Sequence, residues 1–213
     1  MTAPGAVVFD CDGVLVDSEP HSVVSWLTVL GRLGHPATAA DIERCIGFGF
    51  LPTRQALALL GPLPEPEVLA PALLASLADS FRSGLHRFPD AVDTLAASER
   101  AGVPLAVASA SARSRLNLTL NSAGLAHRFS ASVAGDEVSN GKPAPDVYLR
   151  AAHLLGIDPV SCVAIEDSPI GAQSAVAAGM RTIGIVRRAQ DRDALTAAGA
   201  EVVEVLTGDV LGV

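Results

Sequence analysis

Short runs of consecutive apolar residues recur along this chain, and the clearest of them end at a polar residue. The runs lie at residues 6–9, 104–108, 132–134, 162–165 and 182–186. They lack the alternation of apolar and polar residues that is typical of a strand with one face in water, so we expect both of their faces to be covered. This pattern is typical of parallel strands in the middle of an α/β protein.

Helical patterns fill the spaces between these runs. They cover residues 90–100, 111–122, 145–155 and 168–178, and a glycine follows each of them closely. We expect Ser111 to cap the second of these helices and Ser168 with Pro169 to open the last. Strands that alternate with helices in this way predict a doubly wound α/β core with a parallel sheet.

Residues 18–86 follow a different pattern. They show helical periodicity broken by glycines and prolines, with no convincing strand. Ser18 and Pro20 favour a helix start, and Gly34 favours its end. We therefore expect residues 1–17 and 87–213 to form the core domain and residues 18–86 to form a small helical insert.

Charge and composition limit the classes of partner. The net charge is −8 and aromatic residues make up 4% of the chain, which argues against a nucleic-acid-binding surface. No apolar stretch is long enough to span a bilayer, and Cys11, Cys45 and Cys162 are too scattered for a disulfide framework. We expect a cytoplasmic protein, a monomer or weak homo-oligomer, that binds a small metabolite and neither nucleic acid nor membrane.

Acidic residues follow two of the predicted strands. Asp10 and Asp12 follow the first strand, with Gly13 to permit a tight turn, and Glu166 and Asp167 follow the fourth. Each motif alone is also compatible with an ordinary turn or helix cap. Together they would place four carboxylates at one sheet edge, where each like-charge pair at about 4 Å costs on the order of 4 kcal/mol. A divalent cation removes that cost, and oxygen ligands favour Mg²⁺.

A carboxylate nucleophile fits this arrangement. The metal would reduce the repulsion between Asp10 and an anionic phosphate, while Lys142 and the Ser109 hydroxyl hold the phosphoryl oxygens. Asp12 would act as general acid and base in a two-step reaction through an aspartyl-phosphate on Asp10.

Four stretches resemble the haloacid dehalogenase superfamily, in particular its phosphatase and β-phosphoglucomutase-like branch. They are residues 8–19 (VFDCDGVLVDSE), 108–111 (ASAS), 141–146 (GKPAPD) and 165–168 (IEDS), and they occur in the order found in the family. The resemblance implies a Rossmann-like core with a helical cap after the first strand, and an enzyme of the phosphoric monoester hydrolase type.

The resemblance also implies roles for individual residues. Asp10 is the nucleophile and a Mg²⁺ ligand, and Asp12 is the acid and base that ligates through its backbone carbonyl. Ser109, Ala110 and Lys142 bind the phosphate. Asp167 binds the metal, and Glu166 is either a ligand or a partner of the ligands.

The cap departs from the mutase pattern. The mutases have a histidine twelve residues after the nucleophile, where this chain has Ser22, and an arginine soon after the cap glycine, where the nearest here is Arg54. We therefore expect plain hydrolysis of a sugar, polyol or sugar-acid phosphate. A sugar-phosphate mutase is the alternative, with Arg44, Arg54 or Arg82 as the second anchor. Phe48 and Phe50 either line a pocket or pack between cap helices.

Overall fold

The computed structural model describes residues 3–47 and 49–213, and the chain divides into two compact units. The first contains residues up to Asp17 and from His86 onward, and the second is Ser18–Leu85. His86 lies in the first unit, one residue before the expected start at 87, because it pairs with Asp17 in a short antiparallel ladder. That ladder joins β2 (Val16–Asp17) to β3 (His86–Arg87).

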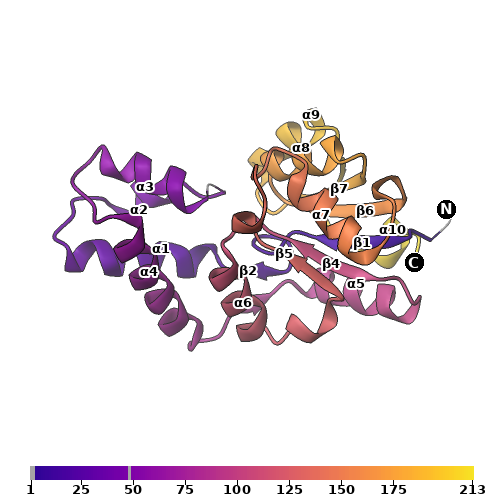
Figure 1. The fold of residues 1–213 in the computed structure, drawn as a ribbon, viewed down its shortest axis with the longest axis horizontal. Coiled ribbons are helices and arrows are strands. Elements are labelled where there is room, and N and C mark those ends of the chain that lie inside the picture. Colours follow the sequence, from indigo (N-terminus) through magenta and orange to yellow (C-terminus); the bar gives the residue numbers. More distant parts are fainter. Residues whose placement is uncertain (1–2, 48) are drawn as a thin grey trace. The chain divides into compact units, whose positions relative to one another are not determined.

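The first unit contains a six-stranded parallel sheet in the order β5-β4-β1-β6-β7-β8 (Figure 1). Its strands are β1 (Ala6–Phe9), β4 (Leu105–Ala108), β5 (Ala131–Val133), β6 (Cys162–Glu166), β7 (Arg181–Ile185) and β8 (Glu201–Val203). Four-residue β1 and β4 are buried at every position, as the unbroken apolar runs predict. Strands β4 and β5 follow β1 on one side of the sheet, and β6, β7 and β8 follow on the other side. The topological switch point of the sheet therefore lies at β1.

Helices cover both faces of this sheet (Figure 1). They are α5 (Pro89–Arg100), α6 (Arg113–Ser122), α7 (Asp146–Leu155), α8 (Pro169–Ala177), α9 (Arg192–Ala197) and α10 (Gly208–Leu211), with short turns η1 (Ala126–Arg128), η2 (Gly135–Glu137), η3 (Pro159–Ser161) and η4 (Ala189–Asp191). Small residues such as Ala6 and Ala106 let α7 pack closely on the sheet, where Tyr148 is fully buried. The predicted doubly wound, Rossmann-like α/β core is confirmed.

One strand was not predicted, and one local expectation was wrong. Strand β8 was not predicted, because its three residues include an exposed glutamate and are only half-buried elsewhere. Helix α6 begins at Arg113 with Ala112 as its N-cap, so Ser111 does not cap it. The Ser111 hydroxyl instead donates to Asp12 Oδ2 at 3.0 Å.

Among its described residues, the second unit consists of helices joined by loops, with no strand. Its helices are α1 (Glu19–Arg32), α2 (Ala39–Glu43), α3 (Phe50–Ala58) and α4 (Pro66–Phe81). Trp26, Leu30 and Leu69 belong to its apolar core, and Phe50 stacks on Trp26 with ring centroids 6.2 Å apart. Phe50 therefore packs within this unit, whereas Phe48 lies outside the described residues. No helix among the described residues has the length and apolar character to cross a membrane.

Candidate active site

Asp10 lies at the carboxyl end of β1, at the centre of the sheet. Parallel pairing aligns Phe9 with Ile165 of β6 and with Val107 of β4, and the Asp10 amide donates to the Ile165 carbonyl at 2.9 Å. The ends of these three strands therefore lie side by side. Residues that follow them are brought to one edge, as the sequence predicts.

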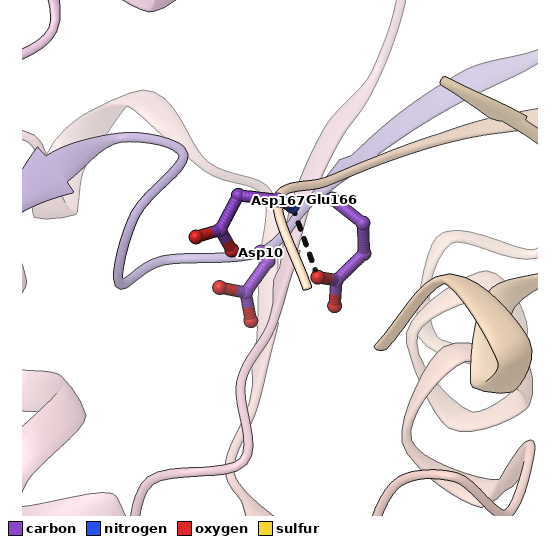
Figure 2. Close-up of side chains that lie close together, drawn as sticks. All are labelled: Asp10, Glu166 and Asp167. Carbon is purple, nitrogen blue, oxygen red and sulfur yellow. Dashed lines mark hydrogen bonds between the residues drawn. The ribbon is translucent and has the colours of Figure 1, made fainter. Parts of the chain in front are cut away.

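Three carboxylates meet at this edge. Asp10, Glu166 and Asp167 each offer one oxygen, and these oxygens lie within 4.8 Å of one another. Figure 2 shows the side chains of Asp10, Glu166 and Asp167 gathered at this edge. Asp10 and Glu166 are buried, with 7% and 0% of their surfaces exposed.

Lys142 supplies a positive charge to this cluster, and it is the one lysine in the sequence. It lies in the loop before α7, next to a cis peptide bond to Pro143. Its Nζ donates to Asp10 Oδ1 at 2.6 Å and to Glu166 Oε1 at 2.5 Å. Burial alone would lower the pKa of Lys142, but the carboxylates of Asp10 and Glu166 raise it above its ordinary value, so the ammonium stays charged.

The Glu166 carboxylate is fully engaged by neighbouring donors. Oε1 accepts from Lys142 and from the Tyr148 hydroxyl at 2.8 Å, while Oε2 accepts from the amides of Asp167 and Ser168 and from the Ser168 hydroxyl. Gly171, in the first turn of α8, makes space for this carboxylate, since a Cβ at position 171 would lie 1.9 Å from Glu166 Oε1. Glu166 therefore acts as a rigid anchor for Lys142.

Tyr148 was missed by sequence reasoning. On α7 it occupies a core position, and its partner Glu166 lies eighteen residues away in the chain. A buried tyrosine hydroxyl needs a hydrogen-bond partner. A tyrosine in a predicted core helix therefore indicates that a partner exists, but it does not indicate which residue the partner is.

Burial and neighbouring charges together shift the pKa of the central carboxylate of this site. Burial is the main cause that raises the pKa of Asp10, to about 7, and Lys142 offsets it only in part while Glu166 and Asp12 add to it. Asp10, Glu166 and Asp167 together offer carboxylate oxygens close enough to share one ion. An all-oxygen donor set of this kind fits a hard divalent cation, so the residues present are suited to a metal ion.

Asp12 lies in the turn after β1 and points toward the start of α6. Its Oδ2 accepts from the Ser111 hydroxyl at 3.0 Å, and its Oδ1 lies 3.4 Å from the Arg115 guanidinium. Gly13 adopts φ +85°, and a Cβ there would lie 2.0 Å from Asp167 Oδ2. Glycine thus permits both the turn and the close approach of Asp167.

Ser109 and Ala110 follow β4 on the other side of Asp10. The Ser109 amide donates to the Val133 carbonyl at 3.0 Å, and its hydroxyl accepts from the Ser111 amide at 3.1 Å. Gly135 closes over this loop: its amide donates to the Ser111 carbonyl at 2.8 Å, and a Cβ there would lie 2.5 Å from the Ala110 carbonyl oxygen. The loop is therefore held on both sides.

Fold and site together define an α/β enzyme core that carries carboxylates and a lysine at the switch point of a parallel sheet. The chain belongs to the haloacid dehalogenase-like hydrolase family, whose model matches residues 7–185.

Comparison with known proteins supports the enzyme class. The fructose-1-phosphate phosphatase YqaB of Escherichia coli K12 is 33% identical over 184 residues, which cover 84% of this chain and 95% of the relative. A haloacid dehalogenase family hydrolase of Deinococcus radiodurans R1, solved with bound phosphate and sodium, is 33% identical with a TM-score of 0.74, covering 99% of this chain and 94% of that one. A β-phosphoglucomutase of Clostridium difficile shares the fold, with a TM-score of 0.80 at 20% identity over 99% and 93% of the two chains.

These matches confirm the predicted family and the predicted class of enzyme, a haloacid dehalogenase-type hydrolase of phosphoric monoesters.

Proposed function

We propose that this protein is a Mg²⁺-dependent phosphatase that hydrolyses a small phosphate monoester of a sugar, polyol or sugar acid through an aspartyl-phosphate on Asp10. The observation that carries the proposal is the contact of Lys142 with Asp10 at 2.6 Å, beside a cluster of carboxylates suited to a metal. The fructose-1-phosphate phosphatase relative supports a phosphorylated sugar as the substrate class.

In the first step a carboxylate oxygen of Asp10 attacks phosphorus and the bond from phosphorus to the ester oxygen breaks. Asp12 gives a proton to the departing alkoxide. In the second step water attacks phosphorus and gives its proton to Asp12, while the bond to Asp10 breaks and inorganic phosphate leaves. Each proton that Asp12 donates is thereby recovered in the same turnover.

Neighbouring groups would handle the charge on the phosphate. Lys142, the Ser109 hydroxyl and the Ala110 backbone would hold the phosphoryl oxygens, because Lys142 contacts Asp10 directly and the other two follow the adjacent strand β4. Asp10, Asp167 and the Asp12 carbonyl would hold the metal, with Glu166 acting chiefly through Lys142. When bound, Mg²⁺ supplies positive charge that reduces the repulsion between carboxylate and phosphate.

The cap favours hydrolysis over the mutase alternative. Arg54, the most buried of the three arginines considered as a second anchor, donates twice to the Pro64 carbonyl, at 3.0 and 2.9 Å. Arg44 pairs with Asp41 and Arg82 with Asp79, both at exposed positions. A bisphosphate intermediate needs a cation directed at its second phosphate, and these arginines are engaged within their own unit.

The test is release of inorganic phosphate from fructose 1-phosphate and glucose 1-phosphate, with Mg²⁺ and with EDTA. We expect phosphate release that EDTA abolishes and Mg²⁺ restores, and a loss of at least about 10³-fold in Asp10→Asn. Asp158→Asn is the matched control, because Asp158 caps η3 before β6, at the opposite end of that strand from the site. Undiminished turnover in Asp10→Asn would refute the assignment, and conversion of glucose 1-phosphate to the 6-phosphate would favour the mutase.

A further inference from the structure

Arg187 joins the end of β7 to the turn that carries Asp12. It is the second residue after β7, and its side chain is 17% exposed. Its Nε donates to the Gly13 carbonyl at 3.0 Å and its Nη2 to the Val14 carbonyl at 3.3 Å. These two carbonyls belong to the residues that directly follow Asp12.

The guanidinium is itself held firmly from the other side. Asp90, in the first turn of α5, accepts from both terminal nitrogens of Arg187 at 3.0 Å. The Phe88 ring lies against the guanidinium, with its centroid 3.8 Å from the Arg187 Cζ. Asp90 also accepts from the Leu206 amide at 3.1 Å, so the carboxylate is fixed to the C-terminal segment as well. A cation braced in this way can hold a backbone turn in one position.

The turn that Arg187 holds determines where Asp12 lies relative to the other acidic residues of the site. Gly13 adopts a positive φ and has Asp167 directly against it, so a small rotation of this turn moves Asp12 relative to Asp10 and Asp167. We propose that Arg187 is a positioning residue that holds the Asp12 turn in its reactive placement. The inference rests on the proposed function, in which Asp12 protonates the leaving group.

Arginine suits this task better than lysine. Its planar fork can serve the two carbonyls and the carboxylate at once, whereas a lysine ammonium is a point charge on a flexible stem. Arg187→Lys should therefore keep much of the attraction to Asp90 while it loses the hold on the Gly13 carbonyl.

The experiment compares two substrates with each variant. A sugar phosphate has an alkoxide leaving group that needs a proton, whereas the p-nitrophenolate of p-nitrophenyl phosphate leaves without one. We expect Arg187→Lys to lower kcat/KM for fructose 1-phosphate about 10–100-fold and to lower kcat/KM for p-nitrophenyl phosphate much less. The ratio of the two values does not depend on the fraction of folded enzyme, so a loss of stability alone cannot change it.

Arg181→Lys is the matched control. Arg181 is the first residue of β7, the strand that precedes Arg187, and it makes a comparable two-pronged pair with Glu201, at 2.8 and 2.7 Å, away from the Asp12 turn. We expect it to leave both kcat/KM values and their ratio unchanged. An equal loss on both substrates in Arg187→Lys, or no loss on either, would overturn the inference.

Asp12→Asn separates this failure from failure of the proposed function. If Asp12 is the general acid, Asp12→Asn shows the same selective loss on the sugar phosphate. A selective loss in Asp12→Asn without one in Arg187→Lys refutes the positioning role alone. The absence of a selective loss in Asp12→Asn refutes the assignment of Asp12, and with it the basis of the inference.

Discussion

Replacing Lys142 with methionine removes the positive charge between Asp10 and Glu166 and keeps a side chain of similar length. The contacts of 2.6 and 2.5 Å each correspond to about 6 kcal/mol of attraction at an effective dielectric of about 20. Desolvation of the three buried charges offsets most of that attraction. The variant keeps the desolvated carboxylates, whose oxygens lie within 4.8 Å of each other and repel by about 3 kcal/mol.

We therefore expect Lys142→Met to lower the free energy of unfolding by about 3–5 kcal/mol in metal-free protein, the range found when a buried ion pair loses one partner. That loss is a large part of the total stability of a typical domain. Mg²⁺ should restore more stability to the variant than to the wild type, because a bound cation replaces part of the missing charge.

The assay is urea unfolding in EDTA, followed by far-UV circular dichroism, and repeated with Mg²⁺. Trp26 lies in the core of the helical unit, so its fluorescence reports on that unit separately. Arg181→Met is the control, because it breaks a more exposed pair with Glu201 and should cost about 0–1 kcal/mol. A loss in Lys142→Met no larger than that of the control would refute the reasoning from buried charge.

Two further predictions concern Gly171 and Asp90. Gly171→Ala brings a Cβ to 1.9 Å from Glu166 Oε1. We therefore expect it to lower the free energy of unfolding by about 1–3 kcal/mol, with a lower melting temperature and lower activity. Gly31→Ala on α1, with open space around it, should instead stabilise by about 0.5–1 kcal/mol, and equal melting shifts in the two variants would contradict this explanation. At Asp90, burial favours a higher pKa, but the hydrogen bonds from Arg187 and a backbone amide outweigh it and hold the pKa below its ordinary value. The ionised form is thus favoured by folding, so the stability difference between wild type and Asp90→Asn, measured by urea unfolding, should be full near neutral pH and shrink as the pH falls below about 4. A difference that grows on acidification would be the wrong sign for this mechanism.

The sheet was predictable because its central strands are buried on both faces. Ala6–Phe9 and Cys162–Glu166 contain runs that no solvent-facing strand would have, and their register brings Asp10 beside Glu166. Strand β8 lacks this signal, since it is the last strand in the order of the sheet formed by the described residues, and its own residues are partly exposed.

The meeting of the acidic residues was predictable from their place at strand ends, and Lys142 was singled out by the GKPAPD stretch that resembles the family, but their supporting partners were not predictable. Tyr148 and Arg187 act across the fold, on Glu166 and on the Gly13 turn, and nothing in their local sequence distinguishes them from a core aromatic and a surface arginine. Ser111 was expected to cap a helix because serine is a favourable N-cap residue. It instead donates a hydrogen bond to Asp12, which lies 99 positions away in the sequence. Contacts between distant segments are set by the folded sheet, which local pattern does not encode.

The solitary Lys142 has a practical consequence for spectroscopy. Protein grown with isotope-labelled lysine would carry a single labelled side chain, and that side chain touches the proposed nucleophile. One ammonium resonance would then report on the binding of a metal, a phosphate or a substrate analogue, with no assignment problem and no background from other residues. The other basic side chains are arginines and histidines, which would stay unlabelled, so this enzyme carries a single reporter at its proposed reaction centre.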